Sequence, residues 1–296
     1  MKKFNGLHLF VFLVTYPILL VFSYLPHSLL YLLSDFLSFF LYRIVKFRLK
    51  IVRKNLTLSF PIKSFSEIKK IERKFYQHFS DLMVEMIKNF SISKKEMLNR
   101  YKFKNIELIN DEEKKGKSTI LILGHFSNWE GMLTIGSHLI GNSYGIYTPL
   151  TNKFFERKMK ESREKYGSFL LSRYKTYDFI KSMKNSKDYG LFGFIGDQSP
   201  KKDSKSYLRT FMGVKVPVFT GAERIAKKYN FPIFYCQINR VKRGFYKAEI
   251  TPLAKKPLEY NDNEITNLFF DRLEEQIKQN PAEYLWTHNR FKYMVK

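Results

Sequence analysis

The chain has 296 residues, enough for one α/β domain with accessory helices and too few for two large domains. Its 52 Lys and Arg against 27 Asp and Glu give a formal net charge of +25, so we expect an anionic partner: a phospholipid surface, a phosphorylated glycolipid, an acidic carrier protein or nucleic acid. The single cysteine, Cys236, excludes an intrachain disulfide, and its place in an apolar run predicts a buried thiol.

The N-terminal segment predicts a membrane anchor. No Asp, Glu, Lys or Arg occurs from Phe4 to Ser34. The most apolar part, residues 9–25, would reach about 26 Å as a helix, against a hydrocarbon core of roughly 30 Å. The run has no small-residue cleavage site after it, since the first alanine of the chain is Ala222, so we expect an uncleaved anchor.

A second apolar stretch, residues 29–45, is interrupted by Asp35 and is expected to lie along the membrane interface. The cations that flank it predict a cytoplasmic position for the rest of the protein; they are Arg43, Lys46, Arg48, Lys50, Arg53 and Lys54. Residues 66–90 carry apolar side chains at helical spacing, which predicts an amphipathic helix packed on the core. We therefore expect an anchor and interfacial segment at 1–50, a helical region at 51–100 and an α/β domain at 101–296.

The remainder of the chain alternates between short apolar runs and helical patterns. Strands are expected at 118–125, 143–149, 190–196, 232–239 and 246–252, and helices at 128–141, 153–166, 176–186, 220–229 and 264–280. This order predicts an α/β fold with a mixed, mostly parallel sheet flanked by helices. The turn at 241–244 is expected to form a hairpin that adds an antiparallel edge.

The first of these strands ends at His125, and Glu130 follows five residues later. A histidine at a strand end is well placed for catalysis, because the strand holds the backbone while the loop exposes the side chain. Acyl transfer to a hydroxyl needs a base and a group that holds the base in one tautomer, and His125 and Glu130 can supply the two. The alternative for Glu130 is structural, since Ser127-x-x-Glu130 also matches a helix capping box.

A second buried strand ends at Asp197, which can anchor the following loop, hold an acceptor group or form a structural ion pair. The loop is basic and is followed by a helix that begins near Thr220 and Gly221. Its cations are Lys201, Lys202, Lys205, Arg209 and Lys215. These cations and the amides of the helix start predict a phosphate site, with a solvated basic loop as the alternative.

Six blocks in this order resemble the bacterial lipid A late acyltransferases, the lauroyl and myristoyl transferases of the lysophospholipid acyltransferase superfamily. They are the Phe- and Leu-rich N-terminus, residues 42–61, the His-x-x-x-x-Glu block at 121–131, Asp197-Gln198, Phe219-Thr220-Gly221 and residues 284–292. The resemblance implies a membrane-bound O-acyltransferase at the inner membrane, with its catalytic domain on the cytoplasmic side. It would move a fatty acyl chain from acyl carrier protein to a hydroxyl of an anionic, phosphorylated lipid A precursor.

The resemblance also implies roles for individual residues. His125 and Glu130 would be catalytic, and the substrate-binding residues would be Asp197, Lys201, Lys202, Lys205, Arg209, Thr220, Gly221 and Arg290. We expect no cofactor and no metal, since the chain has no His-Glu-x-x-His and no cysteine pair. We also expect no nucleic acid, because no binding signature for it is present.

Two departures from the family pattern concern the substrate. Thr148 stands where members often carry an arginine, so Lys153 or Arg157 is expected to supply that positive charge. Asn289 replaces the first member of a basic pair and leaves Arg290. Two alternatives therefore stay open: an acyltransferase for another glycolipid or an aminolipid, and a basic membrane adaptor without enzymatic activity.

Overall fold

The computed structural model describes residues 6–200 and 206–295. A seven-stranded sheet in the order β1-β9-β8-β2-β5-β3-β4 forms its centre, and every neighbouring pair is parallel except β8 and β9. The strands are Tyr101–Lys104 (β1), Thr119–Leu123 (β2), Asn142–Tyr147 (β3), Ser168–Ser172 (β4), Gly190–Ile195 (β5), Ile233–Lys242 (β8) and Phe245–Ala254 (β9). A separate antiparallel pair is formed by Leu208–Phe211 (β6) and Val214–Pro217 (β7).

Ten α-helices are found in the described ranges 6–200 and 206–295. They are Gly6–Tyr24 (α1), His27–Phe39 (α2), Leu49–Ser59 (α3), Phe65–Lys88 (α4), Lys94–Arg100 (α5), Glu107–Glu113 (α6), Lys153–Glu164 (α7), Thr176–Asn185 (α8), Gly221–Tyr229 (α9) and Glu264–Gln279 (α10). A π-helical turn, Phe40–Ile44 (η1), continues α2, and three 3₁₀ helices complete the fold: Trp129–Ser137 (η2), Pro257–Glu259 (η3) and Pro281–Glu283 (η4).

The predicted fold class, a mostly parallel sheet flanked by helices, is confirmed. Each of the five expected strands is present, and β8 and β9 form the expected hairpin. The hairpin is not the edge of the sheet, however, because β1 pairs with β9 on its outer side. The short strands β1 and β4 were not predicted, and the helix expected at 128–141 is the 3₁₀ helix η2.

Alternating side chains of the central strands form two cores, one on each face of the sheet. Ile120, Ile122 and Phe192 pack with α8, α9 and α10 on one face. Leu121, Leu123 and Leu191 pack with α5, α6 and η2 on the other. Such continuous burial on both faces is typical of parallel strands, and it explains why β2 is entirely apolar except for Thr119.

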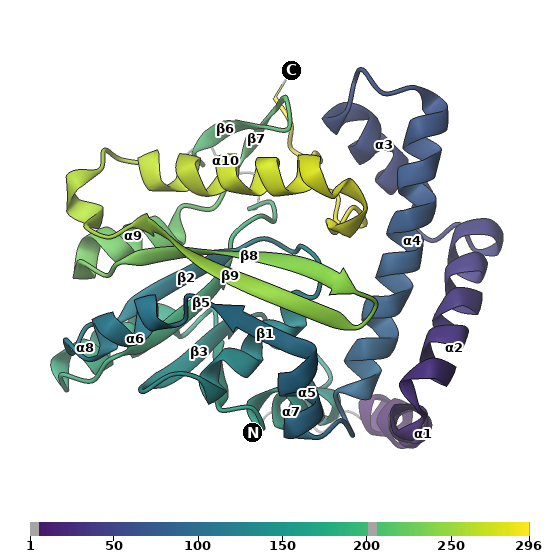
Figure 1. Ribbon diagram of the computed structural model, residues 1–296, viewed down its shortest axis with the longest axis horizontal. Coiled ribbons are helices and arrows are strands. Elements are labelled where there is room, and N and C mark those ends of the chain that lie inside the picture. Colours follow the sequence, from purple (N-terminus) through teal and green to yellow (C-terminus); the bar gives the residue numbers. More distant parts are fainter. Residues whose placement is uncertain (1–5, 201–205, 296) are drawn as a thin grey trace.

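The predicted amphipathic helix is α4, which begins with a capping box formed by Ser64 and Glu67. It stands beside the β8–β9 hairpin, with α2 on its outer side (Figure 1). Asp81 of α4, fully buried, joins these parts by accepting hydrogen bonds from Arg240 and Arg243 of the hairpin and from Ser34 of α2. The N-terminal helices are thus bound firmly to the sheet.

Helix α1 is long and apolar enough to cross a membrane, with 19 residues and most of its large side chains exposed. It packs against α7, where Phe12 contacts the rings of Phe154 and Phe155. The side-chain amide of Asn152, the N-cap of α7, donates to the carbonyl of His8. The candidate anchor therefore lies directly beside the α/β domain.

Candidate active site

The carboxyl ends of β2 and β5 bring His125 and Asp197 into contact, although 72 residues separate them in the chain. Nδ1 of His125 lies 2.7 Å from Oδ1 of Asp197, and the backbone N–H of His125 donates to Oδ2 at 3.1 Å. Burial by itself would raise the pKa of Asp197, but its interactions with His125 and a hydrogen bond from Tyr284 hold the pKa below its usual range. A charged Asp197 keeps the proton of the imidazole on Nδ1 and leaves Nε2 as the basic nitrogen.

The other ring nitrogen of His125 faces a small set of polar and aromatic groups. Its Nε2 lies 3.2 Å from Nε2 of the Gln198 side chain. The indole of Trp129 packs edge-on against the imidazole, with ring centroids 5.2 Å apart. The His125 side chain remains 16% exposed, whereas Asp197 is only 2% exposed, so the pair has one open side. The His125 side chain forms part of the wall of a cavity on that side.

Glu130 does not contact His125. Both oxygens of its carboxylate lie 2.8 Å from Nη2 of Arg163, which comes from α7. The orientation of His125 that we expected from Glu130 is thus supplied by Asp197. The capping box is also absent, because the N-cap of η2 is Asn128, whose side-chain oxygen accepts from the backbone N–H of Gly131.

A tight turn at Ser127 explains where Glu130 points. Ser127 is fully buried and has φ of 50°, a left-handed conformation that is uncommon outside glycine. Its backbone N–H donates to the carbonyl of Glu283, and Leu285 donates to the carbonyl of His125. The chain therefore leaves the direction of β2 after His125. The helix η2 that follows carries Glu130 toward Arg163 of α7.

The C-terminal block completes the frame of the site. Ser199 donates its backbone N–H to Nε2 of His288, whose pKa is lowered by burial, and its hydroxyl to the carbonyl of Arg290. Asn55 of α3 donates to the carbonyls of both Trp286 and His288. Four of the six blocks of the predicted motif set, with bonded residues separated by up to 239 positions, are thus joined by hydrogen bonds around His125.

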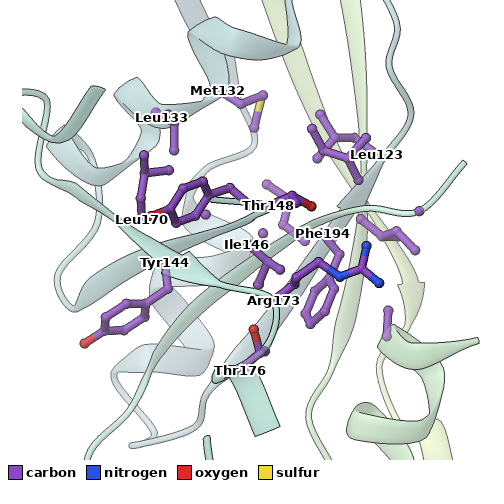
Figure 2. A pocket seen from close by; sticks show the side chains of 18 of the residues that line it. Leu123, Met132, Leu133, Tyr144, Ile146, Thr148, Leu170, Arg173, Thr176 and Phe194 are labelled. Atoms are coloured by element: carbon purple, nitrogen blue, oxygen red, sulfur yellow. The ribbon is translucent and has the colours of Figure 1, made fainter. Parts of the chain in front are cut away.

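A cavity of about 980 Å³ opens beside His125. Most of the labelled side chains in Figure 2 are apolar, among them Leu123, Leu133, Leu170 and Phe194, and Arg173 is the labelled cation. Cationic side chains in the lining are Lys160, Arg163, Arg173, Arg224 and Lys228, and the carboxylates are Glu130 and Glu156. Its size is at the upper end of the roughly 300–1,000 Å³ typical of small-molecule sites. The cavity thus combines apolar walls with positive charge.

Of the predicted substrate-binding residues, Gly221 lines the cavity. Thr220 precedes α9 and makes no side-chain cap. Arg209 is bound away from the site by Asp271 and Glu274 of α10. Arg290 is 1% exposed, stacks over Phe211 and Phe270, and donates to the carbonyl of Pro217 and the hydroxyl of Ser199. Lys201, Lys202 and Lys205 lie outside the described residues.

The replacements expected for the family arginine, Lys153 and Arg157, are not among the residues that line the cavity. Lys153 pairs with Glu156, which does line the cavity, and Arg157 pairs with the exposed Glu161. Thr148 does line it. Two of the five cations that line the cavity are Arg163 of α7 and Arg173, which directly follows β4. Arg163 lies well inside an amphipathic helix, and no local sequence signal distinguishes it from the other basic residues of that helix.

Comparison with known proteins identifies the family of the chain. The model of the bacterial lipid A biosynthesis acyltransferase family matches residues 2–293. The chain belongs to this family. It is 24% identical over 276 residues to a lipid A biosynthesis lauroyltransferase of Escherichia coli K12, covering 90% of this chain and 87% of that protein. It is 20% identical over 272 residues to a lipid A biosynthesis palmitoleoyltransferase of the same organism, covering 90% of this chain and 86% of the other.

A lipid A biosynthesis acyltransferase of Shigella flexneri is similar to the same extent, with 20% identity over 272 residues. Membership of this family makes the protein an acyltransferase, so the expected enzyme class is confirmed and the non-enzymatic adaptor is not supported. The His125–Asp197 pair and the cavity beside it are the candidate site for this activity.

Proposed function

We propose that this protein transfers a fatty acyl chain from acyl carrier protein to a hydroxyl of a phosphorylated lipid A precursor, at the cytoplasmic face of the inner membrane. The observation that carries the proposal is the buried Asp197 bound to His125 at the wall of a large cavity that is both apolar and cationic. An acyl chain needs apolar walls, and the phosphates of the acceptor and of the carrier need cations.

In the proposed reaction His125 acts as the general base. Its Nε2 takes the proton of the acceptor hydroxyl as the oxygen attacks the thioester carbonyl, and the resulting imidazolium is stabilised by Asp197. Collapse of the tetrahedral intermediate forms the ester and breaks the carbon–sulfur bond. The proton on Nε2 then passes to the leaving thiolate, so both His125 and Asp197 return to their starting states.

We infer that Glu130 acts through Arg163. The Glu130 carboxylate and the Arg163 guanidinium are 15% and 16% exposed, and together they fix a positive group in the cavity wall. A bidentate guanidinium suits either the developing oxyanion or a phosphate of the acceptor. This role keeps Glu130 essential for turnover without a contact to His125.

The acidic carrier is expected at the part of the cavity wall formed by α8, α9 and the end of β4. Arg173 and Arg224 are exposed there and make no ion pair within the described part of the chain. Lys228 is exposed as well and contacts the hydroxyl of Tyr177. Three cations beside an opening fit a partner of opposite charge, since such complementarity increases the rate of association.

The acceptor is expected from the opposite side, where α7 contributes Met159, Lys160 and Arg163 to the cavity and also packs against α1. With α1 in the membrane, a lipid acceptor could reach Nε2 of His125 without leaving the interface. The basic flank from Arg43 to Lys54 supports a cytoplasmic α/β domain. For the loop cations Lys201, Lys202 and Lys205 we keep the proposal of a phosphate contact, with Arg290 fixing the start of that loop through Ser199.

Mass spectrometry of lipid extracts from cells with and without the gene tests the proposal. We expect the lipid A precursor to lack one acyl mass when the gene is removed, and to regain it on complementation with the wild-type gene but not with the His125→Ala variant. An unchanged lipid A precursor with a changed second glycolipid or aminolipid would assign a different acceptor. No change in any lipid would contradict the proposed activity.

A further inference from the structure

The central sheet splits between two of its parallel strands. β3 and β5 are paired from Asn142 and Gly190 to Gly145 and Gly193, and there their pairing ends. Beyond this point β5 remains paired with β2 as far as Ile195, and β3 remains paired with β4 as far as Tyr147. The two halves of the sheet therefore separate toward their carboxyl ends, on the same edge as His125.

The cavity occupies this split and reaches both faces of the sheet. Leu133 and Leu170 border it on the face where a side chain at position 145 would point. Ile146 and Phe194, one residue beyond the last pair, border it from the opposite face together with Ile225 of α9. A ligand in the cavity can thus pass from the α9 side of the sheet, through the split, to the η2 side.

Two glycines face each other at the base of the split. A Cβ atom at Gly145 would lie 2.7 Å from Cδ2 of Leu133, so the Leu133 side chain of η2 would have to shift to admit it. A Cβ atom at Gly193 would meet only the carbonyl oxygen of Tyr144 at 3.7 Å and Cα of Gly145 at 4.0 Å, which are ordinary contacts. Position 193 therefore has room for a side chain, and the space that this side chain would enter is the cavity.

The depth of Gly193 follows from the strand register. Gly193 is level with Leu121 of β2, four residues before His125. At about 3.3 Å per residue, roughly 13 Å of strand separate this level from the catalytic histidine. If the reactive end of a ligand is held at His125, the ligand therefore reaches position 193 only with atoms far from that end.

We propose that the acyl chain lies in the split between β3 and β5, and that the absence of a side chain at Gly193 sets the longest chain that fits. This inference rests on the proposed acyl transfer, and it assigns one part of the cavity to the acyl chain. The chain would enter tail first from the α9 side near Gly221, the tail would pass between the strands toward Leu133 and Leu170, and the thioester would stay at His125. The length limit is thus made by backbone separation and one missing side chain.

The test is the series Gly193→Ala, Gly193→Val and Gly193→Leu, assayed with carrier-linked donors from octanoyl to octadecanoyl. We expect the preferred chain to shorten as the side chain grows. The readout is a ratio of two activities: that with the longest donor accepted by the wild type, divided by that with a donor four carbons shorter. For Gly193→Leu this ratio should fall about tenfold or more. One methylene group in an apolar pocket already discriminates between substrates by about that factor. Gly221→Leu is the matched control, since it adds the same side chain to the same cavity near the expected entrance, and it should lower activity with all donors by a common factor.

Direct binding separates this inference from the proposed function. Displacement of a fluorescent fatty acid from the full-length, detergent-solubilised protein by free decanoate and hexadecanoate needs no turnover. Gly193→Leu should weaken hexadecanoate more than decanoate, even if the wild-type protein transfers no acyl chain under the assay conditions. A folded Gly193→Leu protein with wild-type chain-length ratios in both measurements, or a wild-type protein that binds neither fatty acid, would overturn the inference.

Discussion

Asp197 holds His125 by two contacts at once, with Oδ1 2.7 Å from Nδ1 and Oδ2 3.1 Å from the backbone nitrogen. The first contact selects the tautomer of the ring, and the second fixes the residue on which the ring is mounted. Because Asp197 follows β5 and His125 follows β2, the relationship depends on the pairing of these two strands. The carboxylate that holds the imidazole of His125 is therefore 72 residues away from it, and not the one five residues away.

Replacing Asp197 with Asn should lower kcat by about 10²–10⁴-fold, the usual contribution of a positioned base. The Asn amide can donate to Nδ1, which would leave the proton on Nε2 and remove its basicity. His125→Ala should abolish turnover and serves as the reference. Initial rates and their pH profiles at saturating donor give the measurement, with thermal melting to show that both variants fold. An Asp197→Asn enzyme with a wild-type pH profile would show that the carboxylate is only structural.

Glu130 and Arg163 should behave as one unit in a double-mutant cycle. Glu130→Gln and Arg163→Gln are each expected to lower kcat/KM strongly, and the double variant should lose little more than either single one. The coupling energy expected for groups in direct contact is about 0.5–3 kcal/mol. Additive losses in kcat/KM would instead indicate that Glu130 acts on the reaction independently of Arg163.

Reversal of two charges beside the α9 opening should weaken use of the carrier-linked donor. The variant Arg224→Glu with Lys228→Glu is expected to raise the KM for acyl carrier protein with little change in kcat, the signature of lost uniform binding. The effect should shrink as salt rises from low to moderate concentration, since these side chains are exposed.

The matched control for that variant is Lys117→Glu with Lys255→Glu. It has the same change in net charge, but both residues lie at the amino edge of β2, away from His125. Equal increases in KM for the two double variants would show a general charge effect and would locate the carrier elsewhere.

Glu85 should make stability depend on pH. This carboxyl of α4 is partly buried and accepts hydrogen bonds from Asn128, Tyr31 and Tyr246, and its desolvation raises its pKa from 4.5 to about 7. Since the folded pKa lies above the unfolded one, the folded state binds more protons between pH 4.5 and 7, and stability falls as pH rises through that window.

The Glu85→Gln variant isolates this contribution. The difference in unfolding free energy between variant and wild type should change by about 3 kcal/mol across the window, in favour of the variant at high pH. Thermal melts of both proteins in one detergent, at half-unit steps of pH, measure it. Parallel Tm curves for the two proteins from pH 4 to 8 would contradict a protonated Glu85.

Removal of residues 1–24 should reduce the share of protein that stays with membranes after carbonate extraction, because α1 is the described helix that by itself could span a bilayer. Partial retention is expected to remain after high-salt washing, since α2 exposes Leu32, Phe36 and Phe39. Quantitative immunoblots of membrane and soluble fractions give the measurement. Unchanged carbonate resistance would place the anchor in other segments.

Local sequence patterns determined five of the strands of the central sheet, the long helix α4 and the general region of the candidate site. The apolar run of β2, the helical spacing of α4 and the turn at Gly244 each depend on residues that are neighbours in the chain. The sequence therefore predicts these elements without knowledge of distant contacts. His125 and Asp197 were visible as polar residues at strand ends. Because parallel strands carry such residues to one edge, both could be assigned to the site before the structure was known.

Tertiary structure decided which groups touch. The positive φ of Ser127 turns Glu130 toward Arg163 and leaves Asp197 as the partner of His125, a choice that no spacing rule could make. The end of pairing at Gly145 and Gly193 opens the sheet, although the sequences of β3 and β5 read as ordinary buried strands. Both features arise from contacts between residues far apart in the chain, whose geometry is set by packing and not by local propensity.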